Sequence, residues 1–585
     1  MKRLFNRLAV VLILVALMLA GFAVPSRNAQ AVEPDTFYGG WPYSVPPKGH
    51  LNTFVPDGLA LGIYQDLLEP SLAMFVWAQD TYRGLLAESW GFEGDDTYVV
   101  KLKSGARWSD GSPVTARDVV VTYAIGRLRN FADYTYVDTV SQRDELTVEF
   151  KLKNPSTLVE RLLLRTRIRA AGTYGAIAEK VEAFVAAGKD RAGADKPEWD
   201  ALVAEINEYR PAKMLSSGPY TLDLADVTDS QLTLRRNEFS IFKDAKFNKV
   251  VLYNGETEAV TPLFLAKEMY YGTYFFPQPT ERALIEAGFT ILRSPTYSGP
   301  GLFFNYEKVP AFQDVRVRHA IAYAIDRAQV GAVSYGELSG NPAKFMVGIS
   351  DSAVPNWLPQ DVIATLNTYD HDLEKAAQLM QEAGYTKQGD VWTKDGKPFE
   401  VELLVPSDFT DWVPAGENVA EQLTAFGIRT TVRGTPRPQQ VADVKAGNFD
   451  MSILLWGFPN PHPFYAYRNM YITNTVGKLP DEKGASIPLV QTADGVEYDF
   501  AALIAASGAG IDFGPQREAV TKLAVSFNKL LPVVPLVERL GNTPLLAEAF
   551  ESIPAADDPL YINAFGQDSY IVLWLIDGTL APKRR

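Results

Sequence analysis

Hydrophobic and polar positions recur with two different periods along the chain, and their order predicts an α/β protein. Short runs rich in β-branched and aromatic residues, such as 98–102, predict strands. Segments with apolar residues at helical spacing, such as 115–127, predict amphipathic helices. The stretch 175–213 is rich in Ala, Glu, Lys and Asp at helical spacing, so we expect a solvated helical insertion there.

Capping residues mark the ends of two helices in the second half of the chain. Asp372 is suited to cap a helix over 373–383, and Gly384 is suited to end it. A second helix is expected over 418–426, ended by Gly427, before a strand at 428–432. The order of strand, helix, glycine and strand predicts a crossover unit, which builds parallel sheets with covered faces.

The N-terminus has the pattern of a secretory signal peptide. Basic residues precede an apolar run over 8–24, and the small-x-small site Ala29-Gln30-Ala31 follows it. We therefore expect cleavage before Val32; an uncleaved anchor is the alternative, and export is common to both. No later stretch approaches membrane-spanning length without charges, so we expect a soluble mature protein that is periplasmic or otherwise extracytoplasmic.

Composition and charge exclude several classes of function. The chain has no cysteine, which removes disulfides, thiolate metal sites and lipid attachment through cysteine. Of its 56 basic residues, four lie in 1–31, so 52 remain against 70 acidic ones. Nucleic acid and anionic membrane would both repel such a protein. About 554 mature residues exceed one hydrophobic core, so we expect two or three domains.

Motifs for catalysis are missing from the sequence. It contains no Gly-x-Ser-x-Gly, His-Glu-x-x-His, Walker or Gly-x-Gly-x-x-Gly pattern. The four histidines, His50, His319, His371 and His462, do not fall at metal-ligand spacing, although a site assembled in three dimensions stays open. We expect no catalytic residue, no metal and no cofactor. Paired carboxylates among the acidic residues leave a secreted glycoside hydrolase as an alternative.

Four segments resemble the large extracytoplasmic solute-binding proteins of ABC importers, the peptide/nickel/oligosaccharide-binding family. They occur in the family's order and span most of the mature chain. The segments are KLKSGARWSDGSPVTARDVVVTY at 101–123, SSGPYTL at 216–222, FFNYEKVPAFQDVRVRHAIAYAIDR at 303–327 and AFGIRTTVRGTPRPQQVADVKAGNFDMSILLWG at 425–457.

Polar residues within these segments fit structural roles. Asp110-Gly111 suits a turn, Thr115 suits a helix N-cap with Asp118 as its acid, and Trp108 suits the core. Further along, we expect salt-bridged helix ends at Arg316, Arg318 and Asp326.

The resemblance implies a periplasmic-binding-protein-like fold, with two α/β lobes that close about a hinge and an additional inserted lobe. It implies the following division: signal peptide 1–31, lobe I at 32–66, 214–300 and 542–585, lobe II at 67–213, and lobe III at 301–541. In this family the ligand is enclosed between lobes I and III, and the closed form is recognised by the importer. We expect a monomer whose partners are a ligand and the transmembrane subunits of an ABC permease.

An aromatic and proline-rich run, LLWGFPNPHPFYAYRNMY at 454–471, follows a predicted buried strand. We expect it to be loop-like at the C-terminal edge of the sheet and to offer ring faces for stacking on sugars or ligand side chains. Its candidate ligand-binding residues are Trp456, Asn460, Phe464, Tyr465 and Tyr467, and Trp456 is the expected stacking platform. Phe458 and Tyr471 fit the core equally well.

An acid is missing from this run. Peptide binders of the family place an aspartate there that pairs with the peptide's α-amine, whereas this chain has Pro459-Asn460-Pro461 and no Asp or Glu between Asp450 and Asp481. An unpaired buried ammonium is costly, so the sequence favours an oligosaccharide of the β-glucan or cello-oligosaccharide type. The alternatives are an oligopeptide whose amine meets an acid from elsewhere in the fold, and a peptide-chaperone role.

Five further residues are placed near the cleft by the resemblance. They are Trp41 and Tyr43 near the mature N-terminus, Trp77, Asn305 just past the hinge, and Trp412 in a loop between a strand and a helix.

Overall fold

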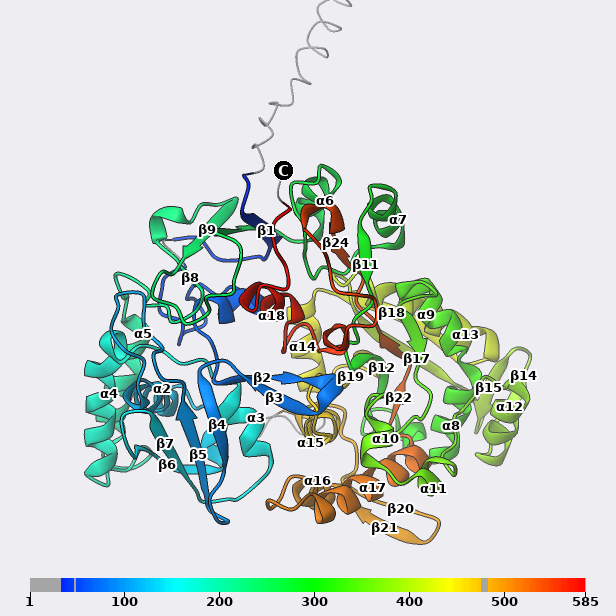
Figure 1. Cartoon of the computed structure of the whole chain (residues 1–585). Coiled ribbons are helices and arrows are strands. Elements are labelled where there is room, and N and C mark those ends of the chain that lie inside the picture. Colours follow the sequence, from blue (N-terminus) through cyan, green and yellow to red (C-terminus); the bar gives the residue numbers. More distant parts are fainter. Residues whose placement is uncertain (1–32, 47–48, 475–481, 584–585) are drawn as a thin grey trace, which may run out of the picture.

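The computed structural model describes residues 33–46, 49–474 and 482–583. The expected signal peptide, residues 1–31, and the expected cleavage point before Val32 lie outside these ranges. Among the described residues, no helix combines the length and the apolar character needed to cross a membrane. Three sheets with separate hydrophobic cores organise the described chain, and we name the corresponding parts lobes I, II and III (Figure 1).

Lobe I combines segments from the start, middle and end of the chain. Its sheet has the order β1-β10-β9-β8, and β1 and β10 are parallel. The strands are β1 (Thr36–Gly40), β8 (Tyr220–Thr221), β9 (Gln231–Arg236) and β10 (Lys249–Tyr253). Two short strands, β11 (Thr290–Leu292) and β24 (Thr543–Leu545), pair beside it, and the helices are α6 (Thr257–Leu265), α7 (Gln278–Glu286) and α18 (Tyr570–Ile576). Every residue of α18 is buried, so the C-terminal segment completes this core.

Lobe II has an antiparallel sheet of order β4-β5-β7-β6. Its strands are β4 (Ala87–Phe92), β5 (Thr97–Leu102), β6 (Val137–Gln142) and β7 (Thr147–Leu152), and its helices are α2 (Ala116–Leu128), α3 (Leu158–Leu164), α4 (Ala171–Ala186) and α5 (Lys196–Glu208). A hairpin of β2 (Ala73–Val76) and β3 (Thr81–Gly84) precedes this sheet and extends toward lobe III (Figure 1).

Lobe III has a mixed sheet of order β18-β17-β19-β12-β22. β17 runs parallel to β18 and β19, whereas β12 is antiparallel to β19 and β22. The strands are β12 (Ser298–Phe304), β17 (Glu400–Pro406), β18 (Arg429–Thr435), β19 (Met451–Gly457) and β22 (Val533–Pro535). Smaller sheets comprise β13 (Gly340–Pro342) with β23 (Val537–Arg539), β14 (Thr386–Gln388) with β15 (Val391–Lys394) and β16 (Lys397–Pro398), and β20 (Val490–Ala493) with β21 (Val496–Asp499).

Helices cover the sheet of lobe III. They are α8 (Val315–Ala324), α9 (Arg327–Tyr335), α10 (Val354–Trp357), α11 (Gln360–Ile363), α12 (Leu373–Glu382), α13 (Trp412–Phe426), α14 (Arg437–Ala446), α15 (Phe464–Tyr467), α16 (Phe500–Ser507) and α17 (Phe513–Leu530). α10 and α17 contact each other, and both lie on the side of lobe III that faces the β2–β3 hairpin (Figure 1).

Local signals in the sequence correspond closely to the observed helix ends. Thr115 and Asp118 form a capping box at α2, and the Asp372 side chain accepts a hydrogen bond from the Lys375 amide at α12. Gly427 ends α13 in the left-handed region with a φ of 113°, where a Cβ would be strained. The parallel pairing of β17 and β18 around α13 is the expected crossover.

Three local predictions are wrong. α13 starts at Trp412, six residues before the predicted start, so Trp412 lies in the first turn of a helix and not in a loop. The expected loop after β19 turns helical at Phe464, where α15 begins. Arg318 has no salt bridge within the described part of the chain; its buried guanidinium donates instead to the carbonyls of Leu530, at the end of α17, and Phe312.

Candidate ligand cavity

A cavity of about 510 Å³ lies where the three lobes meet. The β2–β3 hairpin, β4 and α3 form one wall, and α10, α17 and the loop after β19 form the other. Its volume falls within the range of sites that enclose small-molecule ligands. The lining residues are Phe75, Trp77, Asp80, Thr81, Tyr82, Trp90, Thr157, Leu158, Glu160, Arg161, Tyr297, Ser352, Ala353, Asn356, Trp357, Asn460, Pro461, His462, Phe513, Arg517 and Ile562.

Aromatic rings line both walls of this cavity. On the hairpin side, Phe75 and Tyr82 meet edge to face with ring centroids 4.9 Å apart. On the lobe III side, the rings of Trp357 and Phe513 are 6.3 Å apart and inclined by 61°. Aromatic faces on opposite walls can hold a flat apolar ligand surface between them.

Trp77 lines the cavity, and its side chain is held by contacts with neighbouring residues. Its ring stacks on Tyr297 with centroids 3.9 Å apart, and its indole N–H donates to Asp568 over 3.0 Å. The backbone amide of Trp77 donates to the Asn563 side chain. Trp77 therefore joins the β2–β3 hairpin to two separate segments of lobe I, one at Tyr297 and one at 563–568.

Two acids line the cavity on the lobe II side, Asp80 and Glu160. The Tyr98 hydroxyl donates to Glu160 over 2.9 Å. Burial raises the pKa of Glu160 above its usual value, the Tyr98 hydrogen bond opposes this, and the nearby Asp80 adds to the rise. A cationic ligand group beside these carboxylates would relieve their repulsion.

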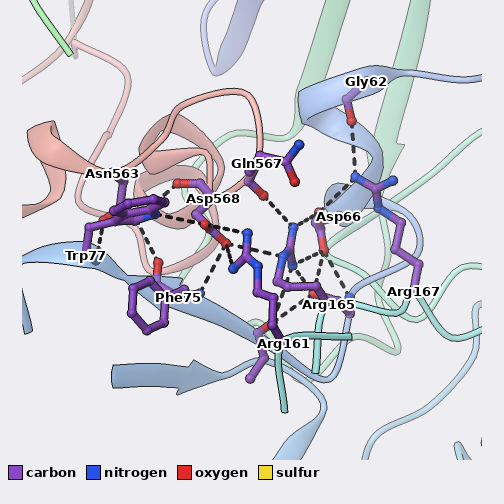
Figure 2. A network of polar contacts seen from close by, with 12 residues as sticks. Gly62, Asp66, Phe75, Trp77, Arg161, Arg165, Arg167, Asn563, Gln567 and Asp568 are labelled. Carbon is purple, nitrogen blue, oxygen red and sulfur yellow. Dashed lines mark hydrogen bonds and ion pairs between the residues drawn. The ribbon is translucent and has the colours of Figure 1, made fainter. Parts of the chain in front are cut away.

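A buried ion-pair network supports this wall (Figure 2). Asp568 is fully buried and accepts two hydrogen bonds of 2.9 Å from Arg161, which lines the cavity. Arg165 contacts both Asp568 and the buried Asp66, and Arg167 also binds Asp66. Burial alone would raise the pKa of Asp66, but Arg165 and Arg167 outweigh it and hold that pKa well below its usual value.

Lobes II and III are joined beside the cavity by backbone hydrogen bonds. The Thr157 amide donates to the Gly510 carbonyl and the Gly510 amide donates to the Pro155 carbonyl, both over 3.0 Å. The Thr157 hydroxyl donates to Gln516 over 2.8 Å, and His462 lies 3.3 Å from the same Gln516 oxygen. Burial lowers the pKa of His462 to about 4, so this ring is neutral at neutral pH.

Of the ten ligand-binding residues expected from the sequence, the structure brings Trp77 and Asn460 to the cavity. Asn460 lies in the loop after β19, and its side-chain oxygen accepts a hydrogen bond from the His462 amide. The other eight do not line this cavity.

The position of Trp456 differs from the expected stacking platform. Its side chain is 1% exposed in the core of lobe III, and its indole N–H donates to the Val537 carbonyl over 2.9 Å. The reason is the central position of β19 in the sheet: apart from the half-buried Leu455, its residues are buried on both faces, so Trp456 has no free ring surface. Tyr467 is likewise fully buried, with its hydroxyl donating to the Val347 carbonyl.

Four other expected residues hold local structure. Trp412 packs edge to face against Phe409, and the Asn305 side chain accepts from the amides of residues 307 and 308 just after β12. Tyr43 donates its hydroxyl to the Thr228 carbonyl within lobe I, and the ring of Trp41 covers Gly62.

Phe464 and Tyr465 lie beside the contact between lobes II and III. Their rings meet edge to face at 5.3 Å, and Phe464 packs near Gly508. The Tyr465 hydroxyl is buried without a hydrogen-bond partner among the described residues.

Sequence reasoning missed most of the cavity lining. Tyr82, Trp90, Glu160, Arg161 and Trp357 come from short or unremarkable segments that only the tertiary structure brings together. One usable signal was the sequence RLLLRTRIR at 161–169, whose alternating arginines need buried acids as partners. Within the described ranges, no group of three or more His, Cys, Asp or Glu side chains is arranged to hold a metal ion.

Comparison with known proteins agrees with this architecture. Residues 81–478 match the family model of the bacterial extracellular solute-binding proteins, family 5 Middle. A putative ABC transporter peptide-binding protein of Brucella ovis is 26% identical over 382 residues, which are 64% of this chain. The match spans 65% of the length of that curated relative.

Two solved structures from Thermotoga maritima share the fold. A periplasmic oligopeptide-binding protein of an oligopeptide ABC transporter superposes with a TM-score of 0.75 at 19% identity, covering 94% of this chain and 99% of that one. Its mannohexaose-bound structure gives a TM-score of 0.69 at 19% identity, with coverage of 95% and 100%. The fold is therefore α/β and periplasmic-binding-protein-like. Because the family model matches more than half of the chain, the protein belongs to the bacterial extracellular solute-binding proteins of family 5.

Proposed function

We propose that this protein is the substrate-binding component of an ABC importer and that it captures an oligosaccharide of the β-glucan or cello-oligosaccharide type. The observation that carries the proposal is the cavity between the lobes, with Tyr82 and Trp90 on one wall and Trp357 and Phe513 on the other. Pyranose rings have flat apolar faces that stack on aromatic rings, and hydroxyl edges that suit the Thr, Ser and Asn side chains of the same lining.

Closure of the lobes would couple binding to transport. The family resemblance implies a ligand between lobes I and III, whereas the two walls of this cavity come mainly from lobes II and III. A ligand that contacts both walls at once would stabilise the arrangement in which Thr157 and Gly510 are hydrogen-bonded. A monomer closed in this way would present one surface to the permease subunits. The division into lobes at residues 66, 213, 300 and 541 is part of this proposal, as is the location outside the cytoplasmic membrane without a lipid anchor.

An oligopeptide is the second candidate, favoured by Asp80 and Glu160. They supply acids that the segment 451–480 lacks, and one of them could pair with a peptide's α-amine. The Brucella ovis relative is named a peptide-binding protein, whereas one of the Thermotoga maritima structures holds mannohexaose. The two candidates differ in charge, and this difference can be measured.

Calorimetry with cello-oligosaccharides and with tri- to pentapeptides tests the proposal. Phe513→Ala removes a cavity ring, and Phe239→Ala is a matched control because the two side chains are 49% and 48% exposed and Phe239 lies outside the cavity. We expect Phe513→Ala to weaken oligosaccharide binding by tenfold or more, which is about 1.4 kcal/mol, and Phe239→Ala to leave it unchanged.

Each alternative has its own outcome in the same experiment. Binding of peptides alone, with affinity that falls as salt is added, would replace the oligosaccharide by the peptide. Release of shorter sugars during the titration would indicate a hydrolase. Equal effects of the Phe513 and Phe239 substitutions would place the ligand outside this cavity.

A further inference from the structure

A second hollow adjoins the ligand cavity on the outer side of lobe III. It measures about 550 Å³ and lies between residues 355–359 and the outer face of α17. Asn356, Trp357 and Arg517 line both hollows, so they form the boundary at which the cavity meets this outer groove. The remaining groove residues are Pro355, Leu358, Pro359, Glu518, Thr521 and Lys522.

Trp357 is held in place at this boundary. Its ring packs edge to face against His462 with centroids 4.6 Å apart, and against Phe513 at 6.3 Å. His462 is itself buried, accepts a hydrogen bond from the Phe464 amide and lies within hydrogen-bond distance of Gln516. An aromatic ring fixed in this way loses little conformational entropy when a ligand stacks on it.

The groove has an apolar side and a polar side. The apolar side is formed by Pro355, Leu358 and Pro359. On α17, the Glu518 and Lys522 side chains pair with each other over 2.9 Å, and the Thr521 hydroxyl donates to the helix backbone. Glu518 and Lys522 are paired with each other, and the Arg517 guanidinium can donate hydrogen bonds to hydroxyl groups, so the groove suits a neutral chain with apolar faces and hydroxyl groups.

We propose that this outer groove is a second binding subsite, which takes the sugar units that extend past Trp357 out of the cavity. The inference rests on the proposed oligosaccharide function. A volume of about 510 Å³ limits how much of a chain the cavity can hold, so a longer chain extends beyond it. The three residues that line both hollows, Asn356, Trp357 and Arg517, place the outer groove directly beside the cavity. The protein therefore selects for chain length as well as for sugar type.

The test is a calorimetric series from cellobiose to cellohexaose on the full mature chain. Thr521→Trp fills the groove from a position on the outer face of α17, and Thr521→Ser is the matched control that keeps the groove open. For the wild type we expect affinity to rise about tenfold between the chains that fill the cavity and cellohexaose. Thr521→Trp should bind cellobiose within about twofold of the wild type and lose the rise, whereas Thr521→Ser should keep it.

The results separate the subsite from the proposed function. Binding of every oligomer with equal affinity, or full cellohexaose affinity in Thr521→Trp, overturns the subsite and leaves the cavity assignment standing. If no cello-oligosaccharide binds and alanine peptides of two to six residues do, the proposed sugar class is wrong, and the subsite for sugar units is wrong with it. Retained melting temperature and cellobiose affinity show that Thr521→Trp is folded.

Discussion

The buried carboxylate of Asp568 offers a sharp test of how the ion-pair network supports the cavity. Asp568→Asn keeps the shape but removes the charge, and it turns one acceptor oxygen into a donor. That donor would face Arg161 at 2.9 Å or the indole N–H of Trp77 at 3.0 Å. Arg161 would then be a buried cation without its bidentate partner.

The expected magnitude follows from the burial of the pair. Asp568 is 0% exposed and the Arg161 side chain is 8% exposed, so water cannot replace the lost interaction. Breaking a buried pair by removing one partner costs about 3–5 kcal/mol. We expect Asp568→Asn to lower the free energy of unfolding by that amount, measured by urea denaturation, and to weaken ligand binding about tenfold because Trp77 and Arg161 line the cavity.

Asp66→Asn is the matched control. Asp66 is 1% exposed and pairs with Arg165 and Arg167, but it does not line the cavity. The Asp66→Asn variant should lower the free energy of unfolding by about as much as Asp568→Asn does, and it should leave the ligand affinity of the folded protein nearly unchanged. The supporting role of Asp568 would be refuted if Asp568→Asn lowered the free energy of unfolding by less than about 1 kcal/mol. An equal loss of ligand affinity in both variants would also refute it.

Two further predictions concern a buried acid and the contact between the lobes. Burial, with a smaller contribution from Asp351, raises the pKa of Glu538 to about 7. Protonated Glu538 therefore contributes stability that is fully present below pH 4.5 and is lost as the pH rises through 7. Glu538→Gln should therefore equal the wild type near pH 4.5 and exceed it by up to about 3 kcal/mol above pH 7 in urea unfolding; a gain that does not depend on pH would contradict this. Thr157→Val removes the hydroxyl donor to Gln516 and should weaken ligand binding about fivefold, roughly 1 kcal/mol, with little change in melting temperature; unchanged affinity would mean that this contact does not favour closure.

Local sequence signals predicted the elements well because they depend on neighbouring residues. The capping box at Thr115 and the left-handed stop at Gly427 act within one turn of chain, so each could be recognised without the rest of the fold. The start of α13 was missed because no capping side chain marks it: Asp411 precedes the helix but its carboxylate binds Arg539 and Tyr335 instead.

The cavity could be predicted only in part because its walls come from distant segments. Trp77 was expected from the family resemblance and Asn460 from the aromatic and proline-rich run, and both line the cavity, but neither signal tells how deeply a neighbouring residue is buried. Trp456 is of a residue type that often stacks on ligands, but its side chain is buried in the core. Trp357 lies in a four-residue helix with no distinctive periodicity, and its role depends on contacts with His462 and Phe513.

The most direct test of the central claim is to fill the cavity and measure binding. Thr81 is an exposed residue of β3 that lines the cavity, so Thr81→Trp should occupy the ligand space without disturbing a core. In calorimetry with cellopentaose, the account predicts clear binding to the wild type and at least a hundredfold loss in Thr81→Trp at an unchanged melting temperature. Wild-type affinity in the folded Thr81→Trp variant would contradict the assignment of this cavity as the ligand site.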